Sequence, residues 1–336
     1  AVGALWTVLL RSGLSGLGLG TVPLDLSDAV AALLPVARTE ETALASSLVR
    51  DLRAPRVVLA LAVGAALASA GAAMQGLFRN PLADPGLIGV SSGSALAAVA
   101  MMVAGSALEL PAGALPYAVP LAAFTGGVIA AWLAVRLAVH DGHTGTATLL
   151  LAGLAINAIA GAGIGLLTQQ AGDAALRDAL FWLFGSLGKA GWGELAVCVP
   201  PLLLIVLWLP RHAGALNALL LGASEAAHLG VDVERFKRRL LFGVVLAVAL
   251  SVALAGLIGF VGLIVPHLMR LLLGPDHRLI LPASALAGAT LLTLADLAAR
   301  TLLSPAEIPV GVLTALIGGP FFLALLVNLR GRTGGW

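Results

Sequence analysis

The chain has 336 residues, of which 60% are hydrophobic and 11% are charged, and its formal net charge is +2. A soluble domain carries about 25% charged residues, so this composition excludes an ordinary soluble enzyme or binding domain. Uncharged runs longer than about 18 residues recur along the chain, which predicts an all-α polytopic membrane protein rather than a barrel of short alternating strands. The single cysteine, Cys198, excludes an internal disulfide.

The uncharged runs predict about ten transmembrane helices within a single domain, 1–336. Arg11 interrupts the first run, and no cleavable signal peptide is evident. We therefore expect Arg11 to be tolerated in a first helix whose natural start has been trimmed. The expected spans are 1–20, 57–78, 86–108, 112–135, 146–170, 194–210, 240–256, 258–273, 279–297 and 308–329.

The seventh and eighth spans come from one long uncharged stretch. It is too long for one span and too short for two full ones. The glycines of "AGLIGFVG", Gly256, Gly259 and Gly262, predict a break followed by a short helix that contains Pro266. Such a break is tolerated where protein or a water-filled cavity covers the freed backbone groups. The two five-span halves begin in opposite orientations, which permits an inverted repeat.

Loop charges predict that both termini are cytoplasmic, because the basic residues are then more numerous inside. Two loops are long: an outer segment at 21–55 and a cytoplasmic segment at 211–239. The leucines of the second segment predict a short amphipathic helix, which fits either a helix on the membrane surface or a docking helix for a cytoplasmic partner. These leucines are Leu216, Leu219, Leu220 and Leu229. The expected inner basic residues are Arg79, Arg136, Arg211, Arg235, Lys237, Arg238, Arg239, Arg270, Arg278, Arg330 and Arg332, and the outer ones are Arg38, Arg50, Arg53, Arg56, Arg177, Lys189 and Arg300.

Catalytic and metal-binding patterns are weak. The stretch "GSLGKAGW" lacks the Ser or Thr of a phosphate-binding loop, and no nucleophile elbow or zincin helix appears. Asp296 lies near a helix end, one turn before Arg300, so we expect a structural i,i+4 pair rather than a proton relay. The histidines lie on or near the expected inner side without convincing ligand spacing, so no metal site is expected. They are His140, His143, His212, His228, His267 and His277.

Arg53, Arg56 and Arg300 form a basic group near the expected outer surface. They are compatible with two roles. In the first, they are ordinary interfacial anchors whose side chains extend to the aqueous phase. In the second, they form a cationic rim for an acidic partner.

The longest motif resembles the signature of the ABC importer permeases for iron–siderophore, haem and cobalamin, the FecCD-like type II importers. Further blocks resemble the same family, so the similarity covers nearly the whole chain after residue 50. The matching blocks are "RAPRVVLALAVGAALASAGAAMQGLFRNPLADPGLIGVSSGSA" (53–95), "LLLAGLAIN" (149–157), "GLIGFVGLIVPHLMRLLLGPDHRLILPASALAGA" (256–289), "LADLAAR" (294–300) and "AEIPVGVLTALIGGPFF" (306–322).

The resemblance implies a permease subunit and not an enzyme. It implies a homodimer in the bacterial inner membrane, with the pathway at the two-fold axis, two cytoplasmic ATPase subunits and a periplasmic substrate-binding protein. No cofactor is expected on this chain, because ATP and Mg are used by the ATPase. The distant alternatives are a secondary carrier without an ATPase and an intramembrane enzyme.

The resemblance also implies site residues. Arg53, Arg56 and Arg300 fall on the binding-protein docking positions. Segment 211–239 falls on the coupling segment that enters the ATPase, although Ala223 stands where the family has an acidic residue and the acid here is Glu225. The implied coupling residues are Leu221, Gly222, Glu225, Leu229 and Gly230, and the implied cytoplasmic gate residues are Asn80, Leu82, Gly145 and Thr146.

The sequences of the C-terminal motifs are most similar to those of haem permeases. A ferric siderophore or cobalamin is the alternative cargo. No histidine lies at the expected outer mouth, so haem would not be bound there through its iron. We expect a largely passive apolar channel, lined by small residues of the fifth and tenth spans, with specificity in the binding protein.

The junction "FRNPLADPGLIGVSSGSA" carries unusually many polar residues and helix breakers between two spans. Pro81 and Pro85 stop one helix from running into the next, and Asn80 and Asp84 suit the turns between them. With the implied gate position, the sequence predicts an inner gate here.

Overall fold

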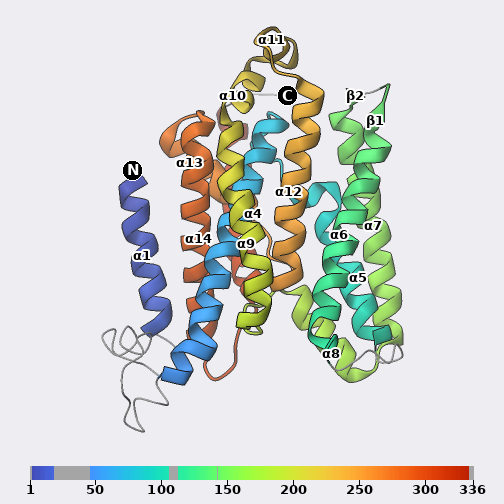
Figure 1. The fold of residues 1–336 in the computed structure, drawn as a ribbon, viewed down its shortest axis with the longest axis vertical. Coiled ribbons are helices and arrows are strands. Elements are labelled where there is room, and N and C mark those ends of the chain that lie inside the picture. The colour runs from blue at the N-terminus through green and yellow to red at the C-terminus, as the bar shows by residue number, and fades with distance from the viewer. Residues whose placement is uncertain (1, 19–45, 106–112, 142, 333–336) are drawn as a thin grey trace.

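The computed structural model describes residues 2–18, 46–105, 113–141 and 143–332. Most of the predicted outer segment at 21–55 lies outside these residues. The described chain is an almost entirely helical bundle (Figure 1), which confirms the predicted all-α polytopic fold. Among the described residues, six helical stretches are long and apolar enough to cross a membrane, and shorter apolar helices accompany them.

The predicted spans are matched, in order, by apolar helices. They are α1 (Val2–Gly18), α4 (Ala54–Leu77), α5 (Val90–Ala104), α6 (Leu115–Ala138), α7 (Thr146–Gln170), α9 (Trp192–Trp208), α12 (Val233–Ala255), α13 (Val261–Leu273), α14 (His277–Thr301) and α15 (Val310–Arg332). The smaller elements between them are η1 (Leu48–Arg53), η2 (Pro85–Ile88), β1 (Val139–His140), β2 (His143–Thr144), α8 (Asp173–Leu183), η4 (Leu209–His212), α10 (Ala213–Leu221) and α11 (Ala223–His228).

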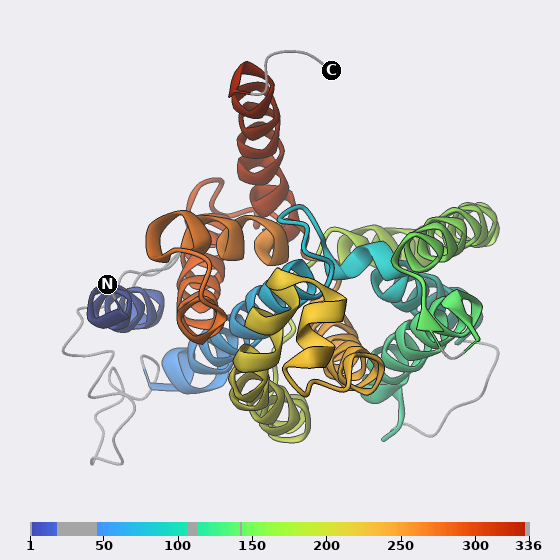
Figure 2. The same cartoon turned by 90° about the horizontal axis from the view of Figure 1, so that it is seen from above.

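Helix α4 is the centre of the bundle and is buried along almost its whole length. It packs against α14, α13, α12 and α9 (Figure 2). The crossing with α14 is close because both helices have a glycine there: a Cβ atom on Gly64 would lie 2.3 Å from the carbonyl oxygen of Gly288. Helices in lipid have no hydrophobic driving force for association. Small residues at a crossing let the two backbones pack closely, and this packing stabilises the pair instead.

Two of the predicted spans are broken helices. The span expected at 86–108 begins only at Val90, because η2 and the left-handed Gly89 (φ 87°) precede it. Asp84 caps the start of η2, where its carboxylate accepts a hydrogen bond of 2.7 Å from the Gly86 amide. The predicted glycine break is confirmed, since α12 ends at Ala255 and α13 begins at Val261.

The bundle has two distinct ends. The α11 end carries α10, α11 and the β1–β2 hairpin, and the α8 end carries α8 and the start of α4 (Figure 1). Neither α8 nor the hairpin was predicted, because both lie in stretches that hydropathy assigns to loops.

Candidate functional site

The predicted coupling segment includes α10 and α11, at the tip of the α11 end (Figure 1). The single amphipathic helix expected there is wrong: Gly222, with φ 129°, separates α10 from α11. Leu216 and Leu219 are buried against the bundle, whereas Leu221 is 69% exposed and Leu229 is 64% exposed. Glu225 is also exposed. The segment therefore offers apolar side chains and the Glu225 carboxylate to the surroundings of this chain.

Asn217 fastens α10 to the start of α14. Its side-chain amide donates to Asp276 Oδ1 at 2.6 Å, and its Oδ1 accepts from the His277 backbone amide at 2.9 Å. The Asp276 carboxylate also accepts from the Arg278 amide, and this bond together with that from Asn217 lowers the pKa of Asp276. Asp276 therefore caps α14 while it also binds Asn217, so hydrogen bonds join α10 directly to the start of α14.

The end of α4 meets α10 and α14 at Gly76. A Cβ atom placed on Gly76 would lie 2.4 Å from His277 Nε2 and 3.0 Å from Leu216 Cδ2. This contact is four residues before Asn80, whose side-chain oxygen accepts from the Leu82 amide at 2.9 Å. The predicted gate residues Asn80 and Leu82 thus lie just beyond the point in the chain where α10 packs against the end of α4.

The second predicted gate loop is connected to the same segment through α12. Glu234, in the first turn of α12, accepts a bond from the Thr144 backbone amide at 3.0 Å and from Lys237 Nζ at 2.8 Å. Thr144 ends the β1–β2 hairpin, and Gly145 and Thr146 follow it at the start of α7. Because α12 directly follows α11 in the chain, the bond from Thr144 to Glu234 connects this loop to the coupling segment.

Both predicted gate pairs lie at the α11 end. Asn80, Gly145 and Thr146 are exposed and Leu82 is half-buried. Within the described residues, no hydrogen bond joins one pair to the other. Their role as gates stays a prediction.

Arg53, Arg56 and Arg300 gather near the α8 end and are all buried. Arg56 Nε lies 2.7 Å from Asp296 Oδ1, and its Nη1 lies 2.9 Å from Glu307 Oε2. Arg300 Nε lies 3.4 Å from Asp296 Oδ2, which confirms the predicted structural pair. The bonds of Arg56 to Asp296 and Glu307 span 240 and 251 positions, so no local spacing in the sequence could have shown them.

The same arginines hold the end of α1. Arg53 Nη1 donates to the carbonyl oxygens of Leu17 at 2.8 Å and Gly18 at 2.9 Å. Arg300 Nη2 donates to the Gly16 carbonyl at 2.8 Å. Burial excludes the side-chain extension into water that interfacial anchors would show. Docking of a partner at these arginines stays a prediction, and Glu307, with a side chain 49% exposed, is the outermost member of their network.

A metal centre has no support among the residues that the structure describes: no group of three or more His, Cys, Asp or Glu side chains could hold an ion. His140 and His143 are paired across the hairpin, and His277 is buried beside Asn217.

Six apolar helices of membrane-spanning length in the described part of the chain, accompanied by shorter apolar helices, define a multi-pass membrane protein. The profile of the FecCD transport family matches residues 8–328. The chain therefore belongs to the FecCD transport family and is a permease of the ABC importer type, as its resemblance to those permeases implied.

Individual relatives are consistent with this assignment. The chain is 47% identical over 285 residues to the hemin transport system permease protein HmuU of Yersinia pestis, covering 85% of this chain and 84% of that protein. It is 46% identical over 282 residues to the cobalamin import system permease protein BtuC of Halobacterium salinarum, covering 84% and 74%. A solved structure of a transporter assigned to the metal-chelate ABC type, in an inward-facing conformation, superposes with a TM-score of 0.83 at 33% identity, covering 97% and 98% of the two chains.

Proposed function

We propose that this chain is the permease subunit of an ATP-driven importer that moves a bulky iron chelate, with haem preferred, into the cytoplasm. A ferric siderophore or cobalamin is the alternative cargo. The sequence identity to a haem permease and to a cobalamin permease is nearly equal. The preference for haem therefore rests on the sequences of the C-terminal motifs.

The observation that carries this proposal is the bonding of the α10–α11 pair. An ATPase that grips the exposed Leu221, Glu225 and Leu229 would displace this pair. Asn217 would pass the displacement to α14 and the nearby end of α4, and Glu234 would pass it to the hairpin before Gly145. One displacement then reaches both predicted gate pairs. The chemistry of ATP and Mg stays on the ATPase.

A second copy of the chain would complete the pathway. Helices α7 and α15 carry many exposed apolar side chains, among them Leu154, Ile159 and Leu316. Covering these faces with a second copy would bury apolar surface and leave a passive channel, with the choice of cargo made by the binding protein.

The sides on which the ATPase and the binding protein are expected set the orientation of the chain in the membrane. We place the α11 end and both termini in the cytoplasm, in a bacterial inner membrane, and the α8 end outside. A periplasmic binding protein would dock there. Arg53, Arg56 and Arg300 outnumber the carboxylates of Asp296 and Glu307, so the buried network presents a net positive field to an acidic partner.

The experiment that tests the proposal reconstitutes the chain with its ATPase in liposomes. ATP hydrolysis is measured with binding protein loaded with haem, a ferric siderophore or cobalamin. We expect the greatest stimulation with haem. Equal stimulation by all three would remove the haem preference, and cargo uptake without ATPase would show a secondary carrier instead.

A further inference from the structure

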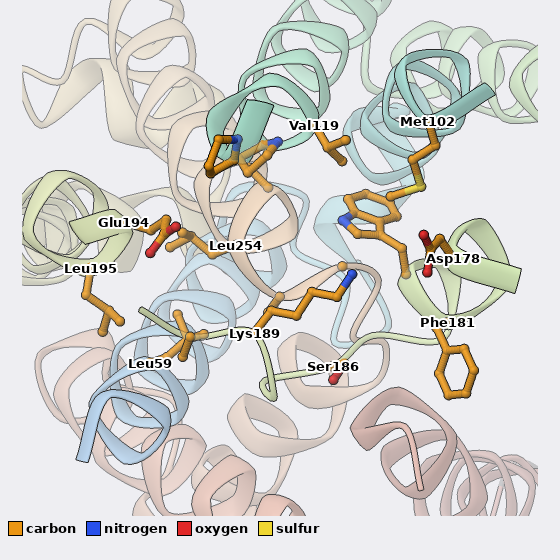
Figure 3. Close-up of a pocket in the computed structure, with 17 residues that line it drawn as sticks. Leu59, Met102, Val119, Asp178, Phe181, Ser186, Lys189, Glu194, Leu195 and Leu254 are labelled. Atoms are coloured by element: carbon orange, nitrogen blue, oxygen red, sulfur yellow. The ribbon is translucent and has the colours of Figure 1, made fainter. Parts of the chain in front are cut away.

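A pocket of about 560 Å³ lies within this single chain near the α8 end (Figure 3). Its volume is in the range of small-molecule sites. Its walls come from α4, α5, α6, α8, α9, the end of α12 and the loop 184–191. It is separate from the coupling segment and from all four predicted gate residues.

The lining of this pocket is amphipathic. Leu59, Met102, Val119 and Leu254 supply apolar surface. Figure 3 shows the Lys189 side chain extending toward the middle of the pocket, with Asp178 and Glu194 on opposite sides of it. Within the described part of the chain, none of these three charged groups takes part in an ion pair.

The end of α12 adds a second source of negative potential. Residues 253–256 line the pocket and include the last turn of α12. The carbonyl groups of a last helical turn carry partial negative charge, and the Ala255 carbonyl here already accepts a hydrogen bond of 2.8 Å from the Ser186 amide. The pocket therefore combines a site for an anion, at Lys189, with a site for a cation, at Glu194 beside the end of α12.

Exposed aromatic residues flank the pocket on α6 and α9. Tyr117 and Trp192, at the starts of α6 and α9, are 47% and 50% exposed, and such aromatic residues gather at the membrane–water interface. Leu121 and Val197, farther along the same two helices, are exposed apolar side chains. These exposed side chains are compatible with a lipid chain lying next to α6 and α9, two of the helices that line the pocket.

We propose that this pocket binds phosphatidylethanolamine from the leaflet at the α8 end. The phosphate lies at Lys189, the primary ammonium lies at the Glu194 carboxylate beside the end of α12, and the start of an acyl chain lies on Leu59, Val119 and Leu254. A headgroup that carries only negative charge fits less well, because it leaves the Glu194 carboxylate without a counter-ion.

The test measures the lipid retained by the purified chain after extraction from vesicles that hold equal amounts of phosphatidylethanolamine and phosphatidylglycerol. Quantitative mass spectrometry is expected to find phosphatidylethanolamine in equimolar amount with the chain. Lys189→Glu should lower its retention about tenfold, since it replaces a charge-assisted bond with repulsion. Leu254→Trp should lower it similarly by filling the pocket with all three charges intact.

Arg177→Glu is the matched control, because Arg177 is exposed on α8 and does not line the pocket. Thermal unfolding of each variant shows whether it is folded, and Lys189→Glu, in an exposed loop, is expected to be. Equal retention in the wild type and both pocket variants overturns the proposal, as does equal retention of phosphatidylglycerol. Displacement of the lipid by haemin would instead make this a cargo site. The measurement needs neither ATPase nor binding protein, so its failure leaves the proposed importer function standing.

Discussion

The Arg56 guanidinium and the Asp296 carboxylate form a buried ion pair, 2.7 Å apart, that joins the start of α4 to the last turns of α14. Gly64 and Gly288 bring the same two helices together farther along. The pair and the crossing together hold α4 against α14, and the predicted coupling segment packs on both helices at the opposite end.

Breaking the Arg56–Asp296 pair should destabilise the permease. Arg56→Ala leaves Asp296 buried with only Arg300 as partner, and we expect a loss of about 3 kcal/mol, the low end of the range for such a change. Denaturant unfolding in detergent measures it. Arg177→Ala, on the exposed face of α8, should change stability little. An equal, small effect of the two variants would contradict the assignment of Arg56 to the core.

Enlarging the glycine crossing should also destabilise the fold. Gly64→Ala places a Cβ atom 2.3 Å from the Gly288 carbonyl oxygen, and we expect a cost of about 1–3 kcal/mol from overpacking. Gly161→Ala is the control, because a Cβ atom there meets nothing within 4 Å. Thermal unfolding compares the two, and the packing argument fails if Gly161→Ala is as damaging as Gly64→Ala.

Removal of the Asn217 amide should weaken the link between α10 and α14. In Asn217→Ala the bonds to Asp276 and to the His277 amide are lost, and we expect ATP hydrolysis by the partner to continue while cargo uptake falls several-fold. Uptake per ATP hydrolysed, measured in liposomes, reports this ratio. Gln169→Ala removes an amide near the other end of the bundle and should leave the ratio unchanged. A parallel fall of hydrolysis and uptake in Asn217→Ala would show general damage and not lost coupling.

Glu234 should hold the β1–β2 hairpin on α12. Glu234→Ala removes the acceptor of the Thr144 amide, so hydrogen–deuterium exchange at Thr144 should speed up several-fold, while exchange inside α7 stays unchanged. Glu225→Ala, on the exposed face of α11, serves as the matched acidic control. Unchanged exchange at Thr144 in the Glu234 variant would show that the hairpin is held by other contacts, and the proposed path to Gly145 would be lost.

The order of the spans could be predicted from the sequence, because an uncharged run of membrane length has few alternatives to a helix. The break between α12 and α13 was predicted for a similar reason, since the stretch had the wrong length for one span or two. The pair of Asp296 with Arg300 was predictable because both residues lie on one helix, one turn apart.

Relationships between distant segments were decided by the tertiary structure. Arg56 has no acidic neighbour in its own helix, and only the packing of α4 against α14 brings Asp296 to it. The same packing places Arg53, Arg56 and Arg300 inside the bundle, where hydropathy had placed them at its surface. The backbone conformation of Gly222 divides the coupling segment into α10 and α11. The spacing of the leucines carries no information about the conformation of a glycine between them. Sequence periodicity reports which residues avoid water along one helix, whereas the choice of partner depends on which helices pack together.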